Sequence, residues 1–250
     1  MLRDEIEPVL YRKMRKALRE HARRIIGALG SPPHAYNATP AFWQDEQETL
    51  ASVLRPLLEQ AAQGAVDIRS GTAKAVAVGA GGGAQTERDK TPITGVVLWD
   101  DALMALSIQQ WASQYSHELG ARLNVTTRGL VDEAARRYAL DLGGNLSEEP
   151  EDEADPSALW LLLLPVYRNR RAESISITET TVAIYAAGQL VSNAFRANGL
   201  RFDRVWYTAR DERVCPICGA NEDVLESDGW GGYVPPAHPN CRCSVYEIRV

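Results

Sequence analysis

Residues 206–250 read WYTARDERVCPICGANEDVLESDGWGGYVPPAHPNCRCSVYEIRV, and this stretch contains all four cysteines of the chain. The cysteines form two pairs, and one of the four histidines lies between them. The spacing is C-x2-C, then nineteen residues, then H-x2-C-x-C, made by Cys215, Cys218, His238, Cys241 and Cys243. All five side chains can bind a metal ion, so the stretch is the first candidate for a structural centre.

Two thiolates two residues apart on a tight turn can bind one ion from the same side, and Pro216 and Gly219 are typical of such a turn. A second pair of ligands from a later loop completes a tetrahedron, the geometry of structural zinc. Because Cys241 and Cys243 point to the same face of an extended segment but lie apart, binding of both beside His238 is disfavoured. We therefore predict zinc bound by Cys215, Cys218, His238 and Cys241, with Cys243 as the main alternative for the fourth position.

The alternatives to a metal are two disulfides or free buried thiols. No secretory signal opens the sequence, so we expect folding in a reducing cytoplasm, where C-x2-C is more often a metal or redox motif. A thioredoxin-like motif is disfavoured because Cys215 is not flanked by a strand and a helix of a βαβ unit.

The site is predicted to be structural, and the protein is predicted not to be an enzyme. A nuclease of the histidine–metal type needs a general base beside its metal, and no other histidine follows His117 except His238. Catalytic zinc also keeps an open position, whereas five ligands for four positions indicate a closed site. Such a site would stabilise a short segment with little core of its own.

Two patches of the sequence carry a family resemblance. W-x-T-A-x-D-E-R-V-C-P-x-C followed by P-P-x-H-P-N-C-R-C resembles the C-terminal domain of phage Mu F-like minor head proteins, the phage head morphogenesis family. Upstream, Arg171-Ala172 and the segment 175–180, I-S-I-T-E-T, resemble a second family patch that precedes a helix. The resemblance covers roughly residues 125–250.

The resemblance implies a minor capsid protein of a tailed phage or prophage. Such proteins associate with the portal and with scaffold or major capsid protein, and they influence DNA packaging or ejection. They enter the interior of the head of the virion after assembly in the host cytoplasm. The alternatives are a metal-dependent nuclease or toxin-like enzyme carried on a head-type domain, and a zinc-dependent nucleic-acid-binding module. The first would need a second cluster of ligands, and the second is disfavoured by four carboxylates and no Lys or Arg over residues 220–232.

The composition is that of an ordinary globular protein, with 24% charged and 45% hydrophobic residues. The net charge of −6 argues against wholesale coating of nucleic acid. No apolar run is long enough for a membrane span, so no membrane association is expected.

Residues 2–29 are predicted to form an amphipathic helix, because apolar residues recur every three or four positions. Seven basic residues and only one acidic residue lie between Tyr11 and Ile25. The simpler interpretation is a solvated polar face; the functional one is a docking face for DNA or for an acidic protein partner. The candidate contact residues are Arg12, Arg15, Lys16, Arg19 and Arg23.

Further helices are predicted over residues 40–65, starting with Thr39-Pro40 as N-cap and first position, and over 98–119 and 124–142. Pro56 should kink or split the first of these. A Gly-rich linker is predicted over 71–95, without the Lys and Ser/Thr of a phosphate-binding loop. The acidic segment 148–155 is expected to be solvated, and the apolar run 159–164 to be buried.

The last part of the chain is predicted as a helix ending near Ala197, with Asn198-Gly199 as its C-cap, and two strands over 202–208 and 244–250. Asp211 and Arg213 should bond the backbone of the metal-binding turn, and Glu179 should have a structural role. The predicted class is α+β: a helical N-terminal region (1–70), the linker (71–95), and a domain of helices and a small antiparallel sheet with a zinc-stapled loop (96–250).

Overall fold

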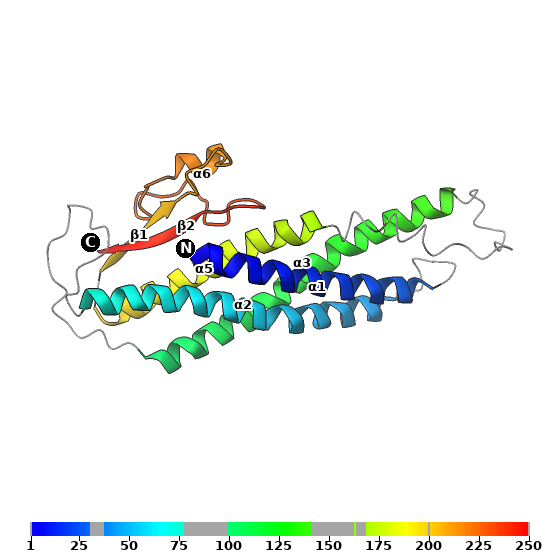
Figure 1. Ribbon diagram of the computed structural model, residues 1–250, viewed down its shortest axis with the longest axis horizontal. Coiled ribbons are helices and arrows are strands. Elements are labelled where there is room, and N and C mark those ends of the chain that lie inside the picture. The colour runs from blue at the N-terminus through cyan, green and yellow to red at the C-terminus, as the bar shows by residue number, and fades with distance from the viewer. Residues whose placement is uncertain are drawn as a thin grey trace. The chain divides into compact units, whose positions relative to one another are not determined.

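The computed structural model describes residues 2–30, 38–77, 100–141, 163, 169–199 and 201–249. Within these ranges the long helices are α1 (Leu2–Leu29), α2 (Pro40–Ala77), α3 (Asp101–Asp141) and α5 (Asn169–Ala197). The strands β1 (Phe202–Tyr207) and β2 (Ser244–Arg249) follow, and the short helix α6 (Pro216–Ala220) lies between them in the sequence (Figure 1). The described chain is mostly helical with one small antiparallel sheet, which confirms the α+β class.

Helix α1 has the bounds that the apolar periodicity predicts. The residues of its apolar stripe are each at most 3% exposed: Leu10, Met14, Leu18, Ile25 and Leu29. The spacing of three and four positions places these side chains on one face, where burial stabilises the helix.

Helix α2 begins as predicted and ends later. The Thr39 hydroxyl accepts a hydrogen bond from the Phe42 N–H at 3.2 Å, and Pro40 occupies the first helical position. Pro56 lies inside the helix, is exposed and does not split it. The helix also continues past its expected end near residue 65 to Ala77, so the first residues of the predicted linker are helical.

Helix α3 is one element where two were expected. It begins after Asp100, whose carboxylate accepts the N–H groups of Ala102 and Leu103 at 2.9 and 3.0 Å. The polar residues near 124 do not cap a new helix. The Thr127 hydroxyl donates to the Leu123 carbonyl one turn back, and the Asn124 amide donates to the Trp43 carbonyl on α2 at 2.7 Å. Because these side chains find partners without interrupting the backbone, the helix continues through them.

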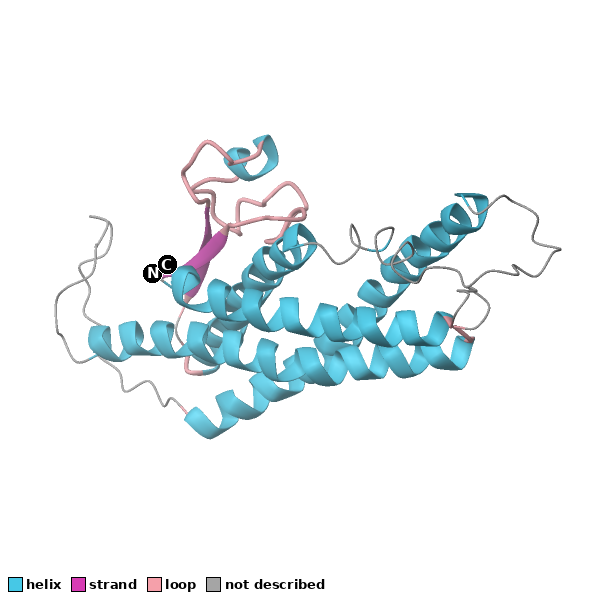
Figure 2. Cartoon of the chain, turned by 45° about the vertical axis from the view of Figure 1, so that its right-hand side comes forward, coloured by secondary structure: helices cyan, strands magenta, loops and turns pink. Residues whose placement is uncertain are grey.

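Helix α5 ends at Ala197, and Gly199 follows in the left-handed region (φ 76°), which confirms the predicted C-cap. The two strands then pair antiparallel, in a register that runs from Phe202 opposite Arg249 to Tyr207 opposite Ser244. They are magenta in Figure 2, and no other strand occurs in the described residues.

The chain divides into two compact units, each made of separate segments. Unit 1 contains Met1–Leu10, Leu58–Trp111 and Ile175–Val250, and unit 2 contains Tyr11–Leu57 and Ala112–Ser174. The candidate metal ligands all belong to unit 1, and the basic residues between Tyr11 and Ile25 of α1 belong to unit 2.

Unit 1 has two apolar clusters. The first joins α2, α3 and α5 through Ala62, Ala65, Val66, Met104, Ile108, Ile184, Ala187, Val191 and Phe195. The second surrounds the cysteines and contains Trp206, Trp230 and Val245, with the two indole rings edge to face at 5.4 Å.

Unit 2 is held together by buried polar links as well as apolar packing. The Arg24 guanidinium binds the buried Glu46 carboxylate at 2.6 and 3.0 Å and so joins α1 to α2. Arg171 at the start of α5 donates to the Thr127 hydroxyl of α3 at 2.9 Å.

Several predicted segments lie outside the described residues: most of the Gly-rich linker, the acidic segment 148–155, and the apolar run 159–164 except Leu163. Leu163 is helical and fully buried (0% exposed), as its place in that run predicts.

Candidate metal centre

The first two cysteines lie on a capped turn that starts α6. Cys215 is the N-cap, Pro216 occupies the first turn, and the Gly219 N–H donates to the Cys215 carbonyl at 2.8 Å. The Cys218 N–H points to the Cys215 Sγ at 3.4 Å. This turn brings both sulfurs to one side of the backbone, as the C-x2-C spacing predicts.

The second ligand segment is a β-turn over residues 238–241. The Cys241 N–H donates to the His238 carbonyl at 3.1 Å, with Pro239 and Asn240 at the two central positions. Asn240 has φ 62°, a conformation that asparagine tolerates better than most residues, and a proline followed by a residue of positive φ is typical of a type II turn.

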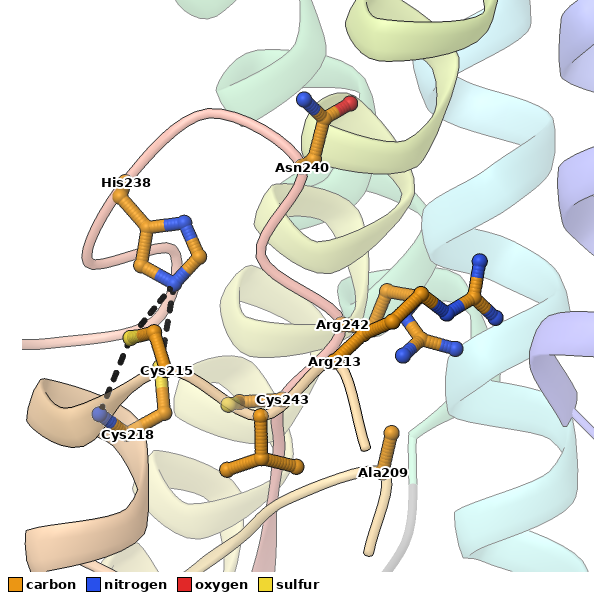
Figure 3. Close-up of a pocket in the computed structure, with 9 residues that line it drawn as sticks. Ala209, Arg213, Cys215, Cys218, His238, Asn240, Arg242 and Cys243 are labelled. Carbon is orange, nitrogen blue, oxygen red and sulfur yellow. Dashed lines mark hydrogen bonds between the residues drawn. The ribbon is translucent and has the colours of Figure 1, made fainter. Parts of the chain in front are cut away.

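The turn also selects the tautomer of His238. Its Nδ1 lies 2.7 Å from the Pro239 carbonyl, which can only accept a hydrogen bond, so Nδ1 carries the proton. The lone pair of Nε2 therefore faces the sulfurs of Cys215 and Cys218 (Figure 3). A backbone partner for the other ring nitrogen is typical of metal-binding histidines.

Three distances between donor atoms are close to the edges of a metal tetrahedron. The His238 Nε2 lies 3.1 Å from the Cys215 Sγ and 3.3 Å from the Cys218 Sγ, and the Cys218 Sγ lies 3.9 Å from the Cys241 Sγ. In a tetrahedral zinc site, adjacent sulfurs are about 3.8 Å apart, and sulfur and nitrogen about 3.6 Å. The donor types fit a zinc ion, and the two sulfur–nitrogen distances are about 0.3–0.5 Å shorter than in a bound site.

The five donor atoms form two groups that share Cys218. Cys215, Cys218 and His238 form one group, and Cys218, Cys241 and Cys243 form the other, with the donor atoms of each within 4.8 Å of one another. One of Cys241 and Cys243 must approach His238 to complete a single tetrahedron. All three cysteines of the second group are buried.

A hydrogen bond joins the two candidates for the fourth position, Cys241 and Cys243. A hydrogen bond from the Cys243 thiol lowers the pKa of Cys241 to about 5, and the same bond, with burial, raises the pKa of Cys243. Burial also raises the pKa of Cys218 to about 12 in the absence of an ion. A metal ligand must be a thiolate, and within this hydrogen-bonded pair one thiol can donate to the thiolate of the other.

The two ligand segments are linked to each other by Asp211. Its carboxylate accepts the Arg213 N–H at 3.0 Å, two residues before the first cysteine rather than in the metal-binding turn itself, and it binds the Arg242 guanidinium at 2.5 and 2.6 Å. The Arg213 side chain adds a longer contact of 3.6 Å to the same carboxylate. Arg242 was not predicted to have this role.

Helix α5 holds the second ligand segment through two threonines. The Thr178 hydroxyl accepts the Asn240 N–H at 2.9 Å, and the Thr181 hydroxyl lies 2.5 Å from the Cys241 carbonyl. Glu179 between them is buried and lies well inside α5, which begins at Asn169, so the helix start expected near it was wrong. The Thr-Glu patch and the H-P-N-C-R-C patch, far apart in the sequence, are therefore in contact.

The candidate contact residues of α1 are brought together on one face. Arg12, Arg15, Lys16, Arg19 and Arg23 line an open depression of about 340 Å³ with one acidic residue, Glu20. Lys16 and Glu20 are 3.9 Å apart and both exposed, so this ion pair is weak. The depression therefore carries an excess of positive charge.

The fold and the site define a largely helical protein whose C-terminal strands and loops surround a Cys/His cluster suited to a structural metal. The family described as phage Mu protein F like protein matches residues 110–246, more than half of the chain. The chain belongs to this family, and the membership indicates a phage head morphogenesis protein and a component of the virion. No curated protein and no solved structure matches the chain.

Among the described residues, no helix combines the length and the apolar character that crossing a membrane requires.

Proposed function

We propose that this chain is a minor head protein of a tailed phage or prophage that acts in procapsid assembly and in DNA packaging or ejection. The family match carries the proposal. The proposed partners are the portal and scaffold or major capsid protein, and the proposed location is the interior of the head, after assembly in the host cytoplasm.

We further propose that zinc is a structural part of the protein. Cys215, Cys218, His238 and Cys241 would hold the ion, and the Cys243 thiol would donate a hydrogen bond to the Cys241 sulfur. When bound, zinc would crosslink the α6 turn and the 238–241 turn.

The protein is proposed not to be an enzyme. The groups of described residues that could hold a metal are the two that share Cys218, and their only imidazole has its free nitrogen directed at two sulfurs. That arrangement supports a closed site without a general base.

The basic face of α1 is the proposed contact surface for the phosphate backbone of packaged DNA or for the portal. Its exposed side chains are mostly arginines, whose planar guanidinium groups bind phosphate through two hydrogen bonds. Aromatic side chains do not line the depression, which favours duplex backbone over stacked single strands.

The test is reversal of three exposed charges, Arg12→Glu, Arg19→Glu and Arg23→Glu. We expect the variant to lose affinity for a duplex oligonucleotide, with a salt slope reduced by about 3, or to lose incorporation into heads if the portal is the partner. Binding is measured by anisotropy at several salt concentrations, and incorporation by protein analysis of purified heads.

The matched control reverses three exposed arginines of α3 in the same unit: Arg128, Arg136 and Arg137. It changes the net charge equally, so its duplex binding and incorporation should stay near wild type. If both variants behave alike, the basic face of α1 is a solvated surface and this contact is wrong.

A further inference from the structure

The start of α1 reaches the segment that carries the second pair of ligands. The Arg3 guanidinium donates one hydrogen bond to the Thr181 hydroxyl on α5 and another to the Glu7 carboxylate at 3.3 Å. The Arg3 side chain is only 19% exposed. Residues 1–10 belong to unit 1 with the metal ligands, whereas the rest of α1 belongs to unit 2.

Thr181 relays this contact to the ligand turn. A guanidinium can only donate, so the Thr181 oxygen accepts from Arg3 and keeps its own proton for another acceptor. The nearer acceptor is the Cys241 carbonyl at 2.5 Å, and the carbonyl of Ile177 lies at 3.3 Å. The first turn of α1 is therefore linked to the backbone of a candidate ligand through one hydroxyl group.

We propose that Arg3 and Thr181 form a metal-dependent latch, in which metal binding at the Cys/His site fixes residues 238–241 and thereby docks residues 2–10 of α1. The latch rests on the proposed metal site. Because binding free energies are reciprocal, a docked α1 start also strengthens metal binding. Thr178 assists by accepting the Asn240 N–H.

Two variants break the latch at different points: Thr181→Val removes the relaying hydroxyl, and Arg3→Gln removes the guanidinium that donates to it. We expect each to weaken zinc binding about 10-fold, within the range of typical coupling free energies. Thr180→Val is the matched control. Thr180 is the adjacent residue of α5 and equally buried (0% exposed), but its hydroxyl has no hydrogen-bond partner among the described residues.

The experiment uses the full chain. Zinc affinity is measured by competition with a chromophoric chelator, and hydrogen exchange is followed by mass spectrometry with zinc and after chelation. We expect exchange of residues 2–10 to rise about 10-fold or more on chelation, while residues 183–197 of α5 change little. Thr180→Val should bind zinc as wild type does.

Different failures have different meanings. Zinc binding without any change in exchange at residues 2–10 would overturn the latch and leave the metal site standing. An equal rise throughout α5 would show general unfolding and would also overturn it. If the wild-type chain binds no zinc, both the latch and the metal site are wrong. Arg3→Gln changes a partly exposed side chain, so it remains a test if Thr181→Val does not fold.

Discussion

At the scale of single residues, burial determines the protonation state of His21. It is fully buried (0% exposed), and desolvation, with the charges of Arg24 and Arg171, lowers its pKa to about 3. Its Nε2 lies 4.0 Å from the Glu46 carboxylate, which would favour a protonated ring. That carboxylate is already bound twice by Arg24, so the neutral form prevails.

The low pKa of His21 predicts acid sensitivity. Below about pH 6.5 the unfolded chain binds a proton that the folded chain does not, so the free energy of unfolding falls as pH falls from about 6.5 toward about 3. At pH 5 the loss from this residue should be about 2 kcal/mol. The measurement is urea unfolding of wild type and His21→Gln at pH 7 and pH 5.

The carboxylates titrate in both proteins, so the comparison isolates His21. Wild type should lose about 2 kcal/mol more than His21→Gln between the two pH values. An equal loss in the two proteins would mean that His21 titrates normally in the folded state.

Some residues of the candidate metal site could be predicted from the sequence, and others could not. The five candidate ligands follow from spacing, because the turns that carry them are local: Cys215 caps its own helix, and His238 and Cys241 end one β-turn. Thr181 and Arg242 could not be found in this way. Their bonds join residues 60 and 31 positions apart, and neither residue type is diagnostic.

At the scale of elements, a part-buried ion pair joins α2, α5 and β2. Arg69 on α2 donates to the carbonyls of Ile184 and Val245 at 2.7 Å each, and its Nε lies 3.3 Å from the Glu247 carboxylate. Burial raises the pKa of Glu247, and Arg69 opposes that shift. Helix α5 comes close to Arg69 and Glu247 at Gly188, where no side chain stands between them.

Gly188→Ala should therefore destabilise the protein even though alanine favours helices. A Cβ at this position would lie 2.9 Å from the Glu247 Oε1 and 3.2 Å from the Arg69 Nη2, so the part-buried pair would have to shift. We expect a loss of about 1–3 kcal/mol in the free energy of unfolding, measured by urea titration.

Gly129→Ala on α3 is the control, because nothing lies within 4 Å of its added Cβ. It should leave stability unchanged or raise it by up to about 1 kcal/mol. If Gly188→Ala is as stable as Gly129→Ala, β2 and α5 must lie farther apart at Gly188 than the 2.9 Å distance to the Glu247 Oε1 indicates.

The elements themselves were predicted where local signals decide them. The ends of α1, the start of α2 and the C-cap of α5 follow from apolar periodicity, Thr39-Pro40 and Gly199. The prediction that two helices meet near Asn124 was wrong. The same polar residues can cap a helix or lie inside one, and only their hydrogen-bond partners distinguish the two cases. The partner of Asn124, the Trp43 carbonyl, lies on another helix.

At the scale of the whole molecule, the described chain combines long helices with a C-terminal segment that has little apolar core. Around the cysteines, the large buried side chains are Trp206, Trp230 and Val245. Residues 208–243 are mostly loop. Ion pairs hold this loop, such as that of Arg210 with Glu222 at 2.5 Å. Segments of this kind commonly depend on a metal for their fold.

The most direct test of this account is the zinc content of the purified, reduced protein, measured by native mass spectrometry for wild type and single variants. We predict one zinc per chain in wild type and in Cys243→Ser, and loss of zinc in Cys215→Ser, Cys218→Ser, His238→Ala and Cys241→Ser. Chelation should unfold residues 208–243 and leave the helices of unit 2 intact. A metal-free wild-type protein, or a disulfide between these cysteines in the reduced preparation, would contradict the structural zinc.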